Sequence, residues 1–256
     1  MKSSPRSFLS FASVLLLSLA ATMPALAAPS AKTIGQVKRG VVSIATFDAN
    51  NKPLLLGGGF FIQANRLVTS IHVLKGASRV TIRTFDGQSY AVEGIVALNE
   101  GNDLALLQTS APRNVYPLSL AANVASEGEP VTLISALDDT SWKVSSGVTS
   151  DLWYIQGAGE YLRITAEVRH GNSGSPVVND KGEVVAVAAL YFEGNDELSF
   201  AVPGEIIRSL LTMTTTSPLI PALPSYSAPF TPERKRPPVK RRRPALLFPH
   251  GNLCGA

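Results

Sequence analysis

Three separated segments of this sequence carry residue types that together can cleave an acyl bond. Ser173 stands in Gly171-Asn-Ser-Gly-Ser-Pro176, where the flanking glycines permit a tight turn that presents its hydroxyl. A serine hydroxyl is a poor nucleophile at neutral pH and needs a base, for which His72 is the candidate. Asp103 can fix the tautomer of that imidazole and stabilise its protonated form. In the same turn the amides of Gly171 and Ser173 can both face a developing oxyanion, and one such donor is worth about 3–4 kcal/mol.

The flanking residues predict where two of these side chains lie. His72 comes at the end of an apolar strand that begins at Leu67, and Asp103 comes directly before a buried strand at 104–108. A turn serine, a strand-end cap and a buried structural histidine are the ordinary explanations of the three residues taken one by one. Their joint occurrence in this order favours the catalytic interpretation.

The elements that must position these residues are predicted to be β-strands. Short β-branched or alternating runs are separated by Gly, Asn, Asp and Lys, which is typical of antiparallel β-structure. Only residues 204–213 have helical spacing of apolar residues. Pro and Gly between residues 110 and 128 divide the strands into two sets, which predicts two antiparallel barrels or sandwiches. The predicted strands are 41–47, 54–62, 79–84, 90–98 and 104–108, followed by 131–136, 143–149, 161–166, 176–179, 184–190 and 198–202.

These motifs resemble those of the trypsin-like peptidases of bacterial envelopes, in particular the HtrA (Deg) protease domain. Chymotrypsin-like double barrels have the chain order His…Asp…Ser, whereas subtilisins and α/β-hydrolases have other orders. The resemblance covers roughly residues 33–212. It rests on the segments Leu67–Leu74, Asn102–Leu107, Gly171–Pro176 and Phe200–Pro203.

The resemblance implies both a fold and an activity. The fold is all-β, with two antiparallel six-stranded barrels at about 33–118 and 125–203 and a short helix at 204–213. The activity is that of a serine endopeptidase with a polypeptide substrate and an acyl-enzyme intermediate. The resemblance assigns the general base to His72, the orienting acid to Asp103, the nucleophile to Ser173 and the oxyanion hole to Gly171 and Ser173.

Three features depart from the HtrA pattern. Ser175 stands where HtrA has glycine, as in secreted glutamyl endopeptidases, but residues 185–190 lack the histidine with which those enzymes line their specificity pocket. Asn172 replaces the aspartate that captures a newly cut N-terminus in trypsin zymogens, so we expect no activation by that ion pair. A Pro- and Arg-rich tail occupies the place of the peptide-binding PDZ domain.

The resemblance places the primary specificity pocket near Glu167, Ala188, Ala189 and Leu190. Glu167 lies six residues before the nucleophile, at the base of that pocket. A buried carboxylate is costly unless it meets solvent or a cation. The cation is either a protein side chain, for which Arg169 is the candidate, or a Lys or Arg side chain of the substrate before the scissile bond.

The amino-acid composition argues against metal sites, cofactors and nucleic-acid binding. A single cysteine, Cys254, rules out an internal disulfide and a thiolate zinc site, and three histidines leave little room for a histidine-built metal centre. We therefore expect neither a metal nor a cofactor. Residues 29–230 carry 14 basic and 18 acidic residues, so no nucleic-acid partner is expected. The alternative to a peptidase is a catalytically silent barrel domain that binds peptides or acts as a chaperone.

Both ends of the chain differ from its middle. Residues 1–27 have the basic start, apolar run and small residues of a secretory signal peptide, which predicts export to the periplasm or beyond. An uncleaved membrane anchor is the alternative, but the run is shorter than the ~20 residues that a bilayer requires. Residues 214–256 hold half of the 18 prolines and the basic run Arg234–Arg243, which predicts a disordered tail. This tail is either a solvated spacer or a contact to anionic envelope surfaces.

Overall fold

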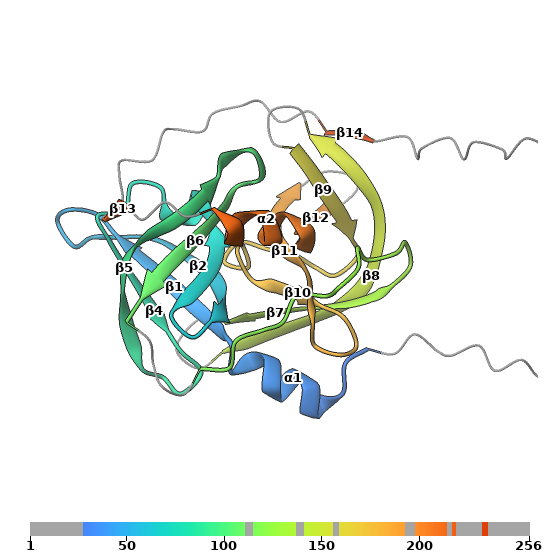
Figure 1. Ribbon diagram of the computed structural model, residues 1–256, viewed down its shortest axis with the longest axis horizontal. Coiled ribbons are helices and arrows are strands. Elements are labelled where there is room, and N and C mark those ends of the chain that lie inside the picture. Colours follow the sequence, from blue (N-terminus) through green and yellow to red (C-terminus); the bar gives the residue numbers. More distant parts are fainter. Residues whose placement is uncertain are drawn as a thin grey trace, which may run out of the picture.

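The chain builds two antiparallel β-barrels that lie side by side (Figure 1). The computed structural model describes residues 28–110, 115–136, 141–155, 159–192, 198–213, 217–218 and 232–234. Within these residues, every pairing between named strands is antiparallel. The predicted fold of two six-stranded antiparallel barrels is confirmed.

The first barrel consists of β1 (Val41–Phe47), β2 (Pro53–Gln63), β3 (Arg66–Ser70), β4 (Arg79–Arg83), β5 (Ser89–Asn99) and β6 (Leu104–Thr109). The strand order is β5-β4-β1-β2-β3-β6, and a further pairing between β5 and β6 closes the barrel. Its interior is filled by apolar side chains such as those of Ile44, Phe61 and Leu107, which are fully buried. Closure satisfies the backbone of the outermost strands, which an open sheet would leave exposed.

The second barrel consists of β7 (Pro130–Ala136), β8 (Trp142–Ile155), β9 (Gly159–Ile164), β10 (Pro176–Val178), β11 (Val184–Phe192) and β12 (Leu198–Pro203). The strand order is β8-β7-β10-β11-β12-β9, and a further pairing between β8 and β9 closes the barrel. Leu133, Val177 and Ala201 are among the buried residues of its interior.

One hydrophobic cluster joins the two barrels. It contains Phe60 and Leu104 of the first barrel together with Ile134 and Phe200 of the second. Helix α2 (Gly204–Thr212), predicted at 204–213, adds the buried Ile207 and Leu210 to this cluster. The two barrels are therefore joined by a packed apolar core, which gives a site built from both barrels a rigid support.

A second helix, α1 (Ala31–Lys38), was not predicted. Its start is capped by the Ser30 hydroxyl, which accepts a hydrogen bond from the Thr33 amide at 3.1 Å. Val37 is the residue that this helix buries. Eight residues with one buried apolar side chain carry too little periodicity to indicate a helix from sequence.

Two described parts of the predicted tail are short strands. β13 (Ser217–Pro218) pairs with Gly94 and Ile95 of β5, and β14 (Pro232–Arg234) pairs with the end of β8. Each pairs with a part of a long strand that its barrel neighbour does not cover, since β4 reaches only Ala91 of β5 and β7 reaches only Val148 of β8. The rest of the predicted tail, residues 214–256, lies outside the described residues apart from Ser217–Pro218 and Pro232–Arg234 and is otherwise a prediction.

Candidate functional site

The turn that carries Ser173 is held by its own backbone. The amide of Asn172 donates to the Arg169 carbonyl at 3.0 Å, and the amide of Ser175 donates to the Asn172 carbonyl at 3.0 Å. Gly171 and Gly174 have φ of +87° and +85°, a conformation that side chains other than glycine rarely adopt. These two glycines are therefore required by the shape of the turn.

Both barrels hold this turn in place. The Gly58 amide of β2 donates to the Ser173 carbonyl at 2.8 Å, and the Gly174 amide donates to the Ala188 carbonyl of β11 at 2.7 Å. The Thr69 hydroxyl of β3 donates to the Gly58 carbonyl at 2.8 Å. Sequence reasoning did not single out Gly58, although three consecutive glycines inside a strand indicate close backbone approach.

His72 and Asp103 are in direct contact in the first barrel. His72 lies in the short 3-10 helix η1 (Ile71–Leu74), and not in the strand that was predicted to continue to it. Nδ1 of His72 is hydrogen-bonded to Oδ2 of Asp103, and the His72 amide donates to Oδ1 of Asp103 at 2.9 Å. The carboxylate thus accepts Nδ1–H, which leaves Nε2 as the nitrogen available for proton transfer.

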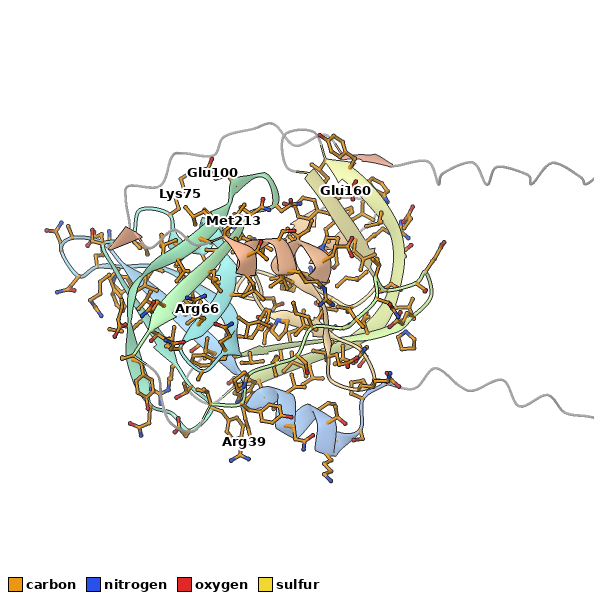
Figure 2. The ribbon with its side chains drawn as sticks, viewed as in Figure 1. Arg39, Arg66, Lys75, Glu100, Glu160 and Met213 are labelled. Carbon is orange, nitrogen blue, oxygen red and sulfur yellow. The ribbon has the colours of Figure 1, made fainter. Side chains whose placement is uncertain are left out.

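Asp103 reaches this position through an unusual backbone conformation. It follows the 3-10 helix η2 (Glu100–Asn102) with φ of +55°, in the left-handed region that Asp tolerates better than most residues. Its carbonyl accepts the Ile71 amide at 3.0 Å. The two 3-10 helices therefore meet at one end of the first barrel, where Figure 2 labels Lys75 and Glu100.

The Ser173 hydroxyl donates to the Ala189 carbonyl at 3.3 Å. Ala189 lies at a register shift in β11, between the pairs Ala188–Ala201 and Leu190–Phe200. Such a bulge turns the backbone away from regular pairing and can direct a carbonyl toward a neighbouring turn. Among the described residues, no hydrogen bond joins Ser173 to His72, so the structure brings the predicted base and acid together but leaves the hydroxyl turned to β11.

The predicted oxyanion donors have no acceptor in the part of the chain that the structure describes. Neither the Gly171 amide nor the Ser173 amide donates to a described group. Asn172, which lies between them, is fully buried, and its side-chain oxygen accepts the Arg169 amide at 2.8 Å. Two unpaired amides beside a serine hydroxyl can stabilise the negative charge of a tetrahedral intermediate.

Glu167 does not lie buried at the base of a pocket. Its side chain is exposed, and its carboxylate contacts Lys143 at 3.0 Å and Arg169 at 2.6 Å. The Arg169 hydrogen bond, followed by that from Lys143, holds the pKa of Glu167 below its usual range. Since protein cations already bind this carboxylate, it gives no argument for a preference for lysine or arginine. Of the other predicted pocket residues, Ala188 and Ala189 are buried, and the side chain of Leu190 lies outside the described part.

Comparison with known families decides the class of this site. Residues 57–187, just over half of the chain, match the trypsin-like peptidase domain. The chain belongs to this family. This confirms the trypsin-like resemblance seen in the motifs, and the chain is also similar to HtrA-type serine proteases.

Relatives of this peptidase domain include two HtrA-type proteases. It is 32% identical over 175 residues to the mitochondrial serine protease HTRA2 of Bos taurus, a match that covers 64% of this chain and 37% of the relative. It is 27% identical over 169 residues to the periplasmic serine endoprotease DegP of Salmonella typhimurium, covering 62% of this chain and 35% of the relative. The chain therefore spans little more than a third of the length of either protein.

A solved structure shares the fold of the peptidase domain. The active form of the Rv3671c protease from M. tuberculosis superimposes with a TM-score of 0.66 and 21% identity, covering 77% of this chain and 92% of that one. Among the described residues, no group of three or more His, Cys, Asp or Glu side chains could hold a metal ion. No described helix is long and apolar enough to cross a membrane.

The peptidase turn depends on the absence of a side chain at Gly58. A Cβ at this position would overlap Oγ of Ser175 and lie 3.0 Å from its Cβ. Ser175 is itself fully buried and accepts a hydrogen bond from the Ser135 hydroxyl at 2.8 Å, so it has little freedom to move. The close packing of Gly58 against Ser175 therefore determines the position of Ser173.

We expect Gly58→Ala to lower kcat/KM for a peptide substrate by about a hundredfold, because a displacement of about 1 Å at a catalytic group costs that much. The double variant Gly58→Ala, Ser175→Gly should recover part of the loss, since it removes the overlapping hydroxyl. Gly35→Ala is the control, because a Cβ there meets nothing within 4 Å. Steady-state kinetics and melting temperatures would test this; equal activity of the single and double variants would contradict the packing argument.

Proposed function

We propose that this chain is an exported serine endopeptidase in which His72, Asp103 and Ser173 form the catalytic triad. The observation that carries the proposal is the pair of contacts from one Asp103 carboxylate to both Nδ1 and the amide of His72. Such a carboxylate fixes the ring orientation and tautomer that a general base needs. The Gly58 amide binds the Ser173 turn to the same barrel, so the first barrel holds all three residues in position.

The reaction would proceed through an acyl-enzyme. The Ser173 hydroxyl rotates away from the Ala189 carbonyl, gives its proton to Nε2 of His72 and attacks the substrate carbonyl carbon. The amides of Gly171 and Ser173 donate to the resulting oxyanion. His72 then protonates the leaving amine as the peptide C–N bond breaks, and water hydrolyses the ester by the same steps in reverse order.

The substrates we propose are unfolded or misfolded proteins of the cell envelope. Relatives named as periplasmic serine proteases support this setting, among them a probable one from Haemophilus influenzae that is 28% identical over 167 residues. The predicted signal peptide of residues 1–27 and the basic run 234–243 support export and contact with anionic surfaces. Apart from Arg234, which ends β14, both segments lie outside the described residues.

The alternative is a silent barrel domain that binds peptides. The hydrogen bond from Ser173 to the Ala189 carbonyl favours it, because the resting hydroxyl is not bonded to its base. Hydrogen bonds in unliganded catalytic sites are often long or poorly aligned, however, and form only in the substrate complex. The presence of the base, the acid and the oxyanion donors therefore favours a peptidase over a silent binding domain.

A fluorophosphonate probe would separate the two functions. We expect stoichiometric labelling of the purified wild-type protein, with the adduct located on Ser173 by mass spectrometry, because only an activated serine attacks phosphorus at a useful rate. Denatured protein should not be labelled. Absence of labelling in a protein shown to be folded by circular dichroism would support the silent binding domain.

A further inference from the structure

The three groups of the proposed triad come from both barrels. His72 and Asp103 belong to the first barrel, whereas the turn of Ser173 lies between β9 and β10 of the second. The two hydrogen bonds from His72 to Asp103 lie within the first barrel and keep the base beside the acid. They do not set the distance from the imidazole to the Ser173 hydroxyl. That distance depends on how the loop of Asp103 is held against the second barrel.

Asn102, the residue before Asp103, reaches across to the second barrel. Its side-chain Nδ2 donates to the Glu160 carbonyl of β9 at 3.2 Å, although the two residues are 58 positions apart. Its backbone amide donates to Oδ1 of Asn99 at 3.0 Å, which caps η2 directly after β5. Figure 2 labels Glu100 of η2 and Glu160 along the same edge of the molecule. The Asp103 loop is therefore bonded to β9 by a side chain whose own backbone is fixed.

The backbone of β9 approaches this loop closely at Gly159. A Cβ at Gly159 would lie 2.7 Å from Nδ2 of Asn102 and 3.0 Å from the Gly101 carbonyl. Gly159 also has φ of +86°, a conformation that residues with a side chain rarely adopt. A side chain at position 159 would push the loop away from β9. The glycine therefore permits the hydrogen bond from Asn102 to the neighbouring carbonyl.

A displacement of Asn102 is passed directly to the base and the acid. Asp103 is the next residue in the chain, and its carbonyl accepts the Ile71 amide at 3.0 Å. Its carboxylate accepts the His72 amide at 2.9 Å and also contacts the imidazole. The two 3-10 helices η1 and η2 are thus bonded to each other through Asp103. When the loop shifts against β9, the imidazole shifts with it, while the bond between base and acid is kept.

We propose that Asn102 is a positioning residue of this peptidase. Its side-chain amide, bonded to β9, fixes the imidazole of His72 relative to the hydroxyl of Ser173. This inference rests on the proposed triad and adds a residue that acts through Asp103 and not on the substrate. Catalytic groups must be held within about 0.5 Å of their productive geometry by the residues that support them. The Gly58 amide already binds the Ser173 turn to the first barrel, and the Asn102 amide binds the acid loop to the second.

The test breaks this contact from each barrel in turn. Asn102→Ala removes the donor of the first barrel, and Gly159→Ala inserts a Cβ from the second barrel that displaces it. A double variant combines the two changes. Asn50→Ala is the matched control, since Asn50 is exposed and its backbone amide, not its side chain, donates to Asp48 at 2.8 Å. Each protein is assayed with the phosphonate probe and with a quenched fluorescent peptide that copies a casein site cleaved by wild type.

We expect Asn102→Ala to lower kcat about tenfold to a hundredfold with KM unchanged, because a misplacement of about 1 Å costs about a hundredfold. Probe labelling should slow by the same factor. Gly159→Ala should behave alike, and the double variant should lose little more than either single variant, since both changes break one contact. The proton NMR resonance of Nδ1–H of His72 should persist in Asn102→Ala, because base and acid shift together. Asn50→Ala should match wild type throughout.

Asn102→Ser keeps a shorter hydrogen-bond donor and should lose less kcat than Asn102→Ala. It is the variant to compare with wild type if Asn102→Ala lowers the melting temperature. A residue with a merely structural role would lower the melting temperature and leave kcat of the folded protein unchanged. The graded loss of kcat from asparagine through serine to alanine separates positioning from packing.

Three results would overturn the proposal. The first is wild-type kcat in both Asn102 variants, which would make the contact purely structural and leave the peptidase function intact. The second is a double variant in which the two single losses multiply, which would show that the contact between Asn102 and Gly159 is not what sets kcat. The third is loss of the Nδ1–H resonance together with kcat, which would mean that the bond between base and acid is broken and not displaced. If wild type itself neither cleaves casein nor reacts with the probe, the proposed function fails as well.

Discussion

Ser173→Ala is expected to reduce kcat about a million-fold, the loss seen when the nucleophile of a serine peptidase triad is removed. Without the hydroxyl there is no acyl-enzyme, and the remaining oxyanion amides and binding contacts can promote only direct attack by water. The turn should survive, because its conformation depends on Gly171, Gly174 and backbone hydrogen bonds. Release of peptides from an unfolded protein such as casein, followed over hours, measures the residual rate.

The control for this variant is Ser209→Ala, an exposed serine on α2. It should retain wild-type activity, and both variants should keep the wild-type melting temperature. Activity of Ser173→Ala within about tenfold of wild type would contradict the assignment of the nucleophile, because Ser175, the other serine of this turn, is fully buried and bonded to Ser135.

Asp103→Asn is expected to lower kcat about ten-thousandfold. The asparagine oxygen can still accept the His72 amide, as Oδ1 does now at 2.9 Å, so the loop should keep its shape. The asparagine NH₂ then donates to Nδ1, which moves the imidazole proton to Nε2. His72 in this tautomer cannot accept the proton of Ser173, so the expected loss comes from the base and not from folding.

Asp180→Asn is the matched control, since Asp180 is exposed in the turn between β10 and β11. Its kcat should equal that of wild type. Labelling by the phosphonate probe should slow in Asp103→Asn in proportion to kcat, while the melting temperature stays close to wild type. A variant that loses activity only because it unfolds would contradict the tautomer explanation.

Local patterns predicted most of the strands, because their residues either alternate in burial, as in β1, or form short continuous apolar runs, as in β6. The prediction 41–47 coincides with β1, whose buried and partly exposed residues alternate along much of its length. The prediction 143–149 covers only the first half of β8, which continues to Ile155. β8 pairs with β7 as far as Val148 and with β9 from Thr149 onward, and its register with β9 shifts between Thr149 and Leu152. Such a change depends on the two neighbours and has no local signature.

The segment around His72 is a second case in which contacts with distant residues override the local sequence pattern. The apolar residues from Leu67 predicted a strand that ends at His72, but the strand ends at Ser70 and η1 begins at Ile71. The Asp103 carboxylate and carbonyl accept the amides of His72 and Ile71, which draws this part of the backbone out of the sheet. A residue 31 positions away thus decides the local conformation.

Residue types and their order along the chain determined the chemistry that this protein can perform, since a hydroxyl, an imidazole and a carboxylate keep their properties in any fold. The sequence also determined the two-barrel architecture through the alternation and turn residues of its strands. Only the tertiary structure decided that the Ser173 hydroxyl faces Ala189 and that protein cations bind Glu167. It also decided that, among the described residues, the side chains of Leu54–Leu56 are exposed. Each of these depends on which segments meet across the barrels, and contacts between distant segments arise from packing of the whole chain rather than from any local pattern.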